Sequence, residues 1–129
     1  MKMLHNQKLL DLSIFLLRVI TGLLFLEYGG MKLFGWFGGL GEGTLPTLIL
    51  VAGILEFFGG AVILLGFWVR PVAFLLSGEM AVAYIMGHAL QGAWYAPVVN
   101  EGTPSVLFCL IFLFFAFYGA GKWSLGKNR

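Results

Sequence analysis

The sequence has one cysteine, Cys109, and two histidines, His5 and His88, and this scarcity excludes several kinds of chemistry. One cysteine cannot form an intrachain disulfide framework or carry out dithiol chemistry. A structural or catalytic zinc site needs clustered cysteine and histidine ligands, and the sequence contains no such cluster. We therefore expect no disulfide, no zinc and no other metal site.

Charged residues are also scarce, at 11% of 129 residues, and the net charge of +2 is too small to indicate a partner. Hydrophobic residues make up 60% of the chain before its 19 glycines are counted. The mean hydropathy is +0.93. A domain of this size leaves much of its surface exposed, so it could not hide that many apolar side chains from water. The composition excludes a soluble enzyme, a disordered tail and a nucleic-acid-binding protein, and it favours an integral membrane protein.

Four apolar stretches are long enough to cross a hydrocarbon core of about 30 Å. They cover residues 12–33, 46–67, 71–91 and 103–121. Their polarity does not alternate from residue to residue, as it would in barrel strands. The fold class predicted is all-α, an integral membrane four-helix bundle that forms one transmembrane domain over residues 1–129.

The basic residues predict the orientation of this bundle. With four spans, both termini and the 67–70 turn lie on one side of the membrane. That side holds Lys2, Lys8, Arg70, Lys122, Lys127 and Arg129. The other side holds at most Lys32, so the positive-inside rule places both termini in the cytoplasm. We expect a multi-pass protein of a bacterial-type inner (plasma) membrane.

Three ionisable residues are predicted in the inner half of the spans. At 1.5 Å per residue, Arg18, Glu79 and Glu56 lie roughly 9, 12 and 15 Å from the cytoplasmic edge. Charges inside a membrane usually face the bundle interior and pair with one another. Arg18 is therefore expected to bridge Glu56 and Glu79, which leaves one surplus carboxyl that would hold a proton. These three residues are the candidate intramembrane polar core.

A second polar group is predicted near the outer face. Glu27, Lys32 and His88 lie roughly 22–30 Å from the cytoplasmic edge, in the outer third of the membrane. With Tyr28 and Tyr84 they form a candidate outer-layer polar or ligand site. His5 lies near the opposite membrane face from His88, so one chain could not clamp a haem between the two. The alternative reading is that all these charges form structural ion pairs that lock the helices together.

The helical phase of the spans predicts which faces meet. Arg18, Gly22, Gly29 and Lys32 share one face of the first span, and Glu27 lies opposite. In the second span the small residues Ala52, Gly53, Gly59 and Gly60 share a face with Glu56, which predicts the close approach of another helix. In the third span Ser77, Tyr84, His88 and Gln91 form a polar stripe and Glu79 points the other way. A helix that is polar on two faces is expected at the centre of the bundle or at an oligomer interface.

Several motifs, in order along nearly the whole chain, resemble those of the DoxX family. They are Leu17-Arg18, GLLF (22–25), GGMKLFG (29–35), EFFGG (56–60), LGFWVR (65–70), MAVAY (80–84) followed by His88, NEG (100–102) and GAGKWSL (119–125). The family usually has histidine where Tyr28 stands. The resemblance implies a small four-helix membrane protein and a link to membrane redox systems. The family's namesake is a subunit of a thiosulfate:quinone oxidoreductase, and relatives are associated with oxidative-stress complexes.

These observations lead to one functional hypothesis and two alternatives. The leading hypothesis is a non-catalytic membrane subunit or anchor of a redox or oxidative-stress complex that contacts quinone. We expect no catalytic residues and no enzyme activity from the chain alone, although it could be a subunit of a quinone-linked oxidoreductase. The first alternative is a small transporter that conducts protons or a solute through the Arg/Glu/His core, and the second is a structural oligomer. Expected partners are the lipid bilayer and either further copies of the chain or another subunit, and not nucleic acid.

Overall fold

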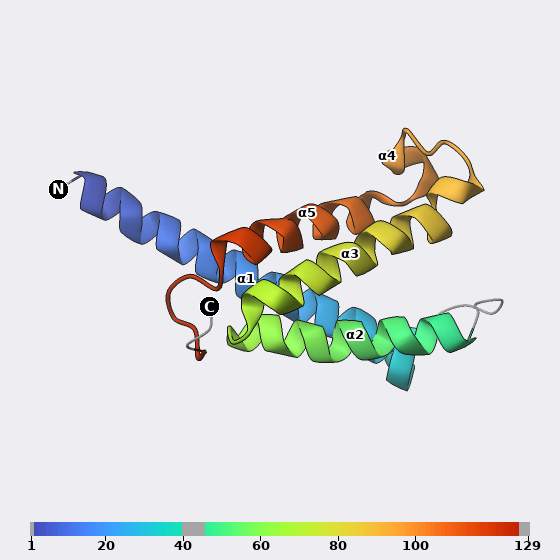
Figure 1. Cartoon of the computed structure of the whole chain (residues 1–129), viewed down its shortest axis with the longest axis horizontal. Coiled ribbons are helices and arrows are strands. Elements are labelled where there is room, and N and C mark those ends of the chain that lie inside the picture. The colour runs from blue at the N-terminus through green and yellow to red at the C-terminus, as the bar shows by residue number, and fades with distance from the viewer. Residues whose placement is uncertain (1, 40–45, 127–129) are drawn as a thin grey trace.

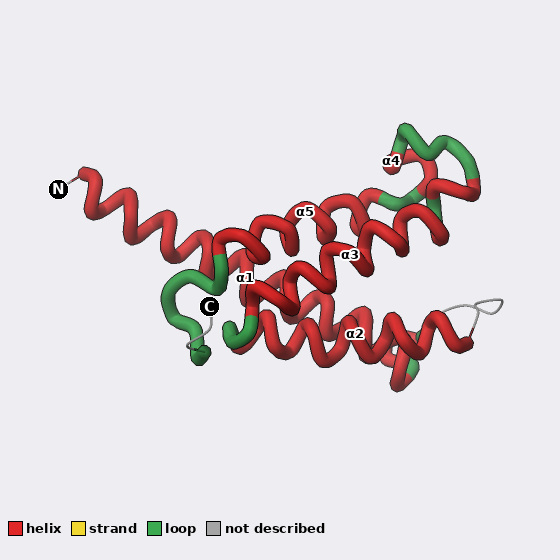
Figure 2. Tube along the Cα trace, viewed as in Figure 1, coloured by secondary structure: helices red, strands yellow, loops and turns green. Residues whose placement is uncertain are grey.

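The computed structural model describes residues 2–39 and 46–126, and the described chain is helical without strands (Figure 2). Four long helices carry the fold: α1 (Lys2–Phe34), α2 (Pro46–Leu65), α3 (Val69–Gly87) and α5 (Thr103–Tyr118). Three short helical turns lie in the connections: η1 (Trp36–Gly38), η2 (Ala89–Gln91) and α4 (Pro97–Asn100). The all-helical prediction is confirmed for these residues.

The four long helices form two pairs. α1 packs mainly on α2, and α3 packs mainly on α5. α2 and α3 are joined by the short turn at residues 66–68 and diverge from it, so the two pairs separate toward the other end of the molecule (Figure 1). α3 contacts both α2 and α5.

Three helices, Lys2–Phe34, Thr47–Leu65 and Val69–Gln91, are long and apolar enough to cross a membrane. α5 is also apolar but has only 16 residues. It is therefore about 24 Å long at 1.5 Å per residue, short of a hydrocarbon core of about 30 Å. A fourth crossing stays a prediction.

Glycines end two of these helices earlier than the sequence predicts. α2 stops at Leu65, two residues early, because Gly66 has a φ of 84°. α5 stops at Tyr118, three residues early, because Gly119 has a φ of 91°. Such left-handed conformations suit glycine and terminate a helix. The chain after Gly119 then turns back across the end of the bundle instead of continuing a span (Figure 1).

Glycines also let α1 and α2 approach closely. A Cβ atom added to Gly22 would lie 2.6 Å from the backbone nitrogen of Leu64. A Cβ added to Gly60 would lie 2.5 Å from the backbone nitrogen of Leu26. Since neither position has room for a side chain, the two backbones meet directly, as small residues permit in membrane helices. The predicted close approach of another helix to the small-residue face of α2 is confirmed: α1 lies against Gly53 and Gly60, while Gly59 lies against Leu76 of α3.

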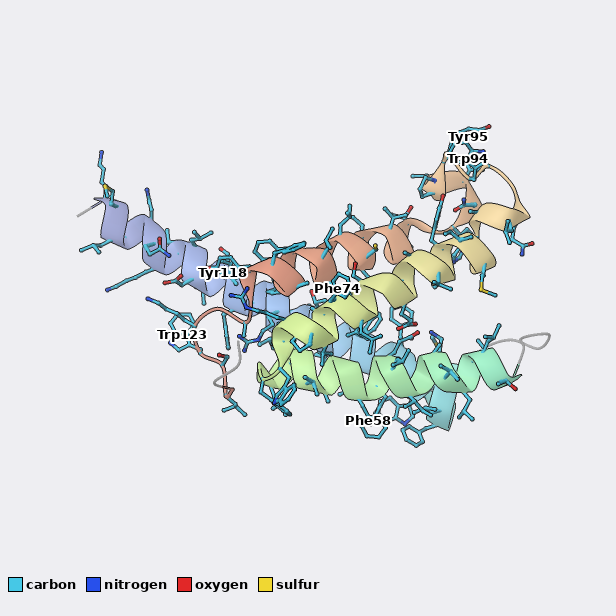
Figure 3. The ribbon with its side chains drawn as sticks, viewed as in Figure 1. Phe58, Phe74, Trp94, Tyr95, Tyr118 and Trp123 are labelled. Carbon is cyan, nitrogen blue, oxygen red and sulfur yellow. The ribbon has the colours of Figure 1, made fainter. Side chains whose placement is uncertain are left out.

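The core is short and apolar, and the outer surface is apolar as well. The buried core side chains are Ile14, Phe25, Ile63, Val69, Ala73, Leu76, Met80, Phe112, Phe115 and Ala120. Large apolar side chains such as Phe58 on α2 and Phe74 on α3 point outward and are exposed (Figure 3). Exposed aromatic residues also lie at both ends, Trp94 and Tyr95 at one and Trp123 at the other (Figure 3). An apolar surface with aromatic residues at both ends is what a bilayer requires.

The start of α1, the turn between α2 and α3, and residues 119–126 all lie at one end of the bundle (Figure 1). We refer to it as the terminal end, and to the opposite end, which holds residues 88–102, as the loop end. Lys2, Lys8, Arg70 and Lys122 belong to the terminal end, whereas Lys127 and Arg129 lie outside the described residues. The grouping agrees with an even number of crossings, and the assignment of this end to the cytoplasm stays a prediction.

Candidate functional site

Arg18 is one of the most buried side chains in the protein, with 1% of its surface exposed, and its donors bind backbone carbonyl groups. Its Nε donates to the carbonyl of Ile63 at 3.1 Å. Its Nη1 donates to Ala120 at 2.7 Å, and its Nη2 donates to Trp123 at 3.0 Å. The expected bridge from Arg18 to Glu56 and Glu79 is therefore wrong.

One of the carbonyls around Arg18 belongs to a helix end, and the others belong to the segment that follows α5. Ile63 lies in the last turn of α2, and Ala120 follows the end of α5. The last carbonyls of a helix lack intrahelical partners and carry the negative end of the helix dipole. Residues 119–126 fold back beside them, and Leu125 donates its N–H to the carbonyl of Leu65 at 3.2 Å. Arg18 thus ties three segments together at the terminal end, which is a structural role.

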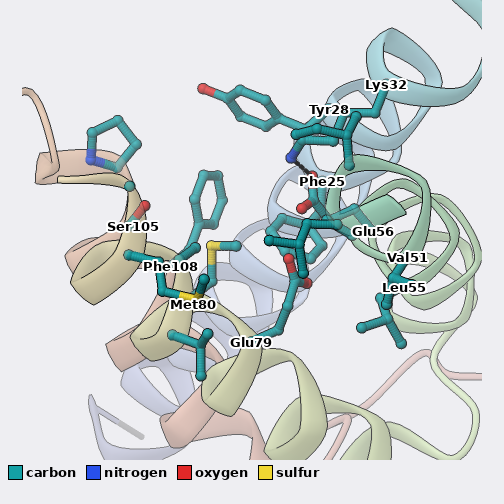
Figure 4. Close-up of a pocket in the computed structure, with 18 of the residues that line it drawn as sticks. Phe25, Tyr28, Lys32, Val51, Leu55, Glu56, Glu79, Met80, Ser105 and Phe108 are labelled. Carbon is teal, nitrogen blue, oxygen red and sulfur yellow. Dashed lines mark hydrogen bonds and ion pairs between the residues drawn. The ribbon is translucent and has the colours of Figure 1, made fainter. Parts of the chain in front are cut away.

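The carboxylate that Arg18 was expected to hold is paired with Lys32 instead. Lys32 Nζ donates to Glu56 Oε1 in an ion pair between α1 and α2 (Figure 4). The Glu56 side chain is 1% exposed and the Lys32 side chain is 16% exposed. The Lys32 ammonium also lies 5.9 Å from the ring centroid of Tyr28. The pair therefore joins Lys32 of the predicted outer group to Glu56 of the predicted inner core. We refer to these two residues, together with Glu79, as the polar cluster.

Two effects bring Lys32 and Glu56 together. A Cβ at Gly22 would lie between Gly60 and Leu64 of α2, whereas the predicted edges place Gly22 level with residue 57. α1 is therefore shifted toward the terminal end by about five residues, or about 7 Å. In addition, a helical side chain leans toward the N-terminus of its own helix. Because α1 and α2 are antiparallel, the Lys32 side chain leans toward the terminal end and the Glu56 side chain leans toward the loop end, so the two approach each other. A Cβ at Gly53 would lie 3.0 Å from the Cβ of Lys32, so the backbone of Lys32 is level with Gly53. This position is nearly one turn from Glu56 toward the loop end, and the Lys32 side chain extends back to Glu56.

Glu79 on α3 joins this cluster from the opposite side. Its side chain points toward Glu56 across the space between the helix pairs (Figure 4). Glu56 Oε2 and Glu79 Oε1 are both inaccessible to solvent and have no hydrogen-bond partner among the described residues. The cluster thus combines one ammonium group with two carboxyl groups. The expectation that one carboxyl holds a proton stays a prediction, now with Lys32 in the place of Arg18.

A cavity of about 540 Å³ lies over the cluster. Its lining is mostly apolar, with Lys32, Glu56, Glu79 and His88 among the polar exceptions. The aromatic part of the wall comes from Phe25 and Tyr28 on α1 and Phe108 on α5 (Figure 4). A mostly apolar cavity of this volume with a few converging polar groups is typical of a small-molecule site.

The cavity opens where α2 and α3 diverge. The residues at its edge are Leu48 and Val51 on α2 and Val82 and Met86 on α3, and about half of the surface of each is exposed. These side chains belong to helices apolar enough to cross a membrane. The opening therefore faces the region that acyl chains would occupy, so a lipid-soluble molecule could enter from the side.

A hydrogen-bond network at the loop end holds the segment that closes the cavity there. Tyr84 donates its hydroxyl hydrogen to the carbonyl of Trp94, and Asn100 Nδ2 donates to the Tyr84 hydroxyl at 3.1 Å. His88 Nδ1 lies 3.0 Å from the carbonyl oxygen of Asn100. Sequence reasoning named Asn100 only within a family motif and missed this role, although an asparagine two residues before a glycine is a recognisable turn signal. Here Gly102 donates its N–H to Asn100 Oδ1 at 2.9 Å.

The other residues of the predicted outer site separate into two groups. Tyr28, Lys32 and His88 line the cavity, whereas Glu27 and Tyr84 do not. Glu79 and His88 face the same cavity although helical phase places them on opposite sides. The reason is that α3 ends at Gly87 and His88 has a φ of −132°, so helical phase does not apply to it. Within residues 2–39 and 46–126, no three histidine, cysteine or acidic side chains are grouped to hold a metal ion.

Comparison with known proteins places the chain in a family. The sequence profile of the DoxX family matches residues 13–89, which are more than half of the chain. The chain belongs to the DoxX family. The matched region contains all the members of the Lys32, Glu56 and Glu79 cluster and most of the residues that line the cavity.

A relative of this DoxX protein is an uncharacterized protein of Haemophilus influenzae, 38% identical over 117 residues. The match covers 87% of each chain. No solved structure matches the chain. The comparisons confirm the resemblance to the DoxX family that the sequence motifs indicate, and they name no ligand.

Proposed function

We propose that this DoxX protein is a non-catalytic membrane subunit that binds a small lipid-soluble ligand in the cavity between its helix pairs. The observation that carries the proposal is the cavity itself, with apolar walls, the Lys32, Glu56 and Glu79 cluster within it, and an opening between α2 and α3. A ligand that partitions into the bilayer would reach this opening without crossing water. The apolar walls would hold its body and the cluster would hold its polar head.

The link to redox chemistry rests on the family resemblance rather than on the cavity. We propose that the chain serves as a subunit or anchor of a redox or oxidative-stress complex in the inner membrane, and that its ligand is of the quinone class. A quinone ring has an apolar body and two polar positions, and it travels within the bilayer. Phe25, Tyr28 and Phe108 offer aromatic faces for such a ring.

Gentle purification followed by mass spectrometry tests this proposal. The protein is extracted from its native membrane under mild conditions, and bound lipids, quinones and proteins are identified. A matched preparation carries Ala83→Trp, which fills the cavity from α3. We expect a bound quinone and a partner protein with the wild type, and loss of the quinone in the variant. Repeated absence of both from the wild type would refute the proposal.

Conduction of protons or a solute through the bundle is the alternative that the geometry disfavours. A path across the membrane would have to connect the Lys32, Glu56 and Glu79 cluster with Arg18. The space between them is filled by fully buried apolar side chains, among them Phe25, Ile63 and Leu76. Flux in proteoliposomes that is abolished by Glu56→Gln would support conduction.

A further inference from the structure

Two buried oxygen atoms in the cavity accept no hydrogen bond. Glu56 uses Oε1 for the ion pair with Lys32, but its Oε2 has no partner within the described chain. Glu79 Oε1 is equally inaccessible to solvent and has no partner either. Most buried side-chain oxygen atoms in proteins are hydrogen-bonded, so each exception needs an explanation. Both atoms belong to residues that line the cavity.

The charges at the cluster favour a ligand that donates hydrogen bonds. The Lys32 ammonium compensates for one carboxylate, and the second acidic group remains. Tyr28 and Ser105 also line the cavity, and each hydroxyl group can either donate or accept a hydrogen bond. Glu101 lines the cavity at its edge and adds a further acidic group. If the carboxyl pair of the polar cluster holds one proton, that proton supplies a single donor. The cluster then still offers more acceptor than donor positions and disfavours a ligand head that carries acceptor atoms only. A head that carries O–H or N–H groups would satisfy these acceptors.

We propose that the cavity selects an amphiphile whose polar head donates hydrogen bonds to Glu56 Oε2 and Glu79 Oε1. Hydroxyl groups on a ring and a protonated amine are the two chemical sources of such donors. The apolar body of the ligand lies against Phe25, Met80 and Phe108, which form the wall beside the cluster. The inference rests on the proposed function because it assumes that this cavity binds a lipid-soluble ligand, and it adds which chemical form is bound.

The selectivity that follows is measurable with matched compounds. A hydroquinone and the quinone with the same ring and tail have nearly the same size, but only the hydroquinone donates O–H groups. A site built around hydrogen bonds to a hydroxyl rejects an analogue that lacks it far more strongly than an apolar pocket rejects a missing methylene. For a ligand of the quinone class, the reduced form is therefore the preferred one.

The test measures equilibrium binding to the full chain in lipid nanodiscs without oxygen. The four probes are a decyl-substituted hydroquinone, the matching quinone, decylamine and decyltrimethylammonium, which has no N–H group. We expect the hydroquinone to bind at least about tenfold more tightly than the quinone, since a buried acceptor left unpaired is costly. Decylamine should likewise bind more tightly than decyltrimethylammonium. The tighter of hydroquinone and decylamine identifies the source of the donors.

Two variants separate the role of Glu79 from effects on folding. Glu79→Gln replaces one acceptor oxygen by an amide that can donate, so the preference for hydroquinone over quinone should shrink by several-fold. Glu27→Gln makes the same change outside the cavity and should leave the preference unchanged. Size-exclusion profiles and unfolding temperatures verify that both variants fold.

The possible failures are distinguishable. If the quinone binds as tightly as the hydroquinone, or if the two ammonium probes bind equally, the inference is wrong while the proposed binding function stands. An unchanged preference in folded Glu79→Gln protein also overturns the inference. If none of the four probes binds the wild type, both the inference and the proposed function fail.

Discussion

Arg18 shows at the scale of one residue why a charge inside a membrane span does not by itself indicate a functional site. Its guanidinium group is buried among the carbonyls of Ile63, Ala120 and Trp123. A planar guanidinium carries five N–H donors in a fixed geometry, against three on the single nitrogen of an ammonium group, so it can serve carbonyls that lie on different segments. Arg18 therefore contributes to the closure of the terminal end and not to the cavity.

The first prediction concerns this role. Arg18→Lys keeps the charge but loses the planar set of N–H donors, so some of the carbonyls of Ile63, Ala120 and Trp123 lose their hydrogen-bond partner. We expect the free energy of unfolding in mild detergent to fall by about 2 kcal/mol or more, because bonds from charged donors are among the stronger ones. Lys8→Ala is the control, since Lys8 is an exposed cation on the same helix. A lysine variant as stable as the wild type would contradict the structural role.

The second prediction concerns the ion pair between Lys32 and Glu56, which a double-mutant cycle measures. Lys32→Met or Glu56→Gln alone removes one partner of a buried pair and leaves the other uncompensated, which typically costs about 3–5 kcal/mol. The double variant should lose clearly less than the sum of the two single losses. The measurement is equilibrium unfolding of all four proteins in the same lipid. Strictly additive losses would show that the two side chains do not interact.

The intramembrane residues themselves were recognisable from sequence, but their partners were not. Charged side chains stand out in apolar helices, so Lys32, Glu56 and Glu79 could be found. The partners depend on how far α1 slides along α2 and on which way each side chain leans. Neither quantity can be determined from the sequence alone. An error of about 7 Å in the axial position of α1 along α2 is enough to pair Glu56 with Arg18.

At the scale of elements, apolar length and glycine spacing carried most of the information. Long apolar runs predicted the four long helices, and the small residues on α2 predicted a closely packed face. The sequence did not show that α1 is the helix against that face, because a face of small residues permits the close approach of any helix. The ends of α2 and α5 were misplaced because the apolar runs continue past Gly66 and Gly119, which stop the helices.

The third prediction tests the contact between α1 and α2. Gly22→Ala adds a Cβ atom 2.6 Å from the backbone of α2, so the helices must separate. Overpacking of this kind typically costs about 1–3 kcal/mol. Gly78→Ala is the matched control, because nothing lies within 4 Å of a Cβ at that position in α3. Thermal unfolding should show a lower midpoint for Gly22→Ala only, and equal midpoints for the two variants would refute the close contact.

At the scale of the whole molecule, the cavity results from the divergence of two helix pairs. Its walls come from α1, α2, α3 and α5, and its edge lies between α2 and α3. The sequence indicated that polar residues gather near the outer face, but not that a space remains between them. Whether four helices close or leave a cavity depends on their crossing angles, which local patterns do not determine.

The fourth prediction concerns the membrane topology of the whole chain. In a Cys109→Ser background, single cysteines are placed at Leu4, Leu125 and Tyr95, all of which are well exposed. A membrane-impermeant maleimide should label Leu4→Cys and Leu125→Cys only when it is given access to the cytoplasm. It should label Tyr95→Cys from the other side. Labelling of all three from one side would contradict the four-span arrangement.

Photo-crosslinking from the mouth of the cavity in native membranes tests directly whether the cavity binds a lipid-soluble ligand. A benzophenone side chain at Met86, which is 49% exposed at the cavity edge, is compared with one at Phe74, which is 64% exposed on the same helix and does not line the cavity. We expect the probe at Met86 to capture one defined lipid-soluble compound, identified by mass spectrometry, and the probe at Phe74 to capture bulk phospholipid. The same mixture of phospholipids at both positions would contradict it.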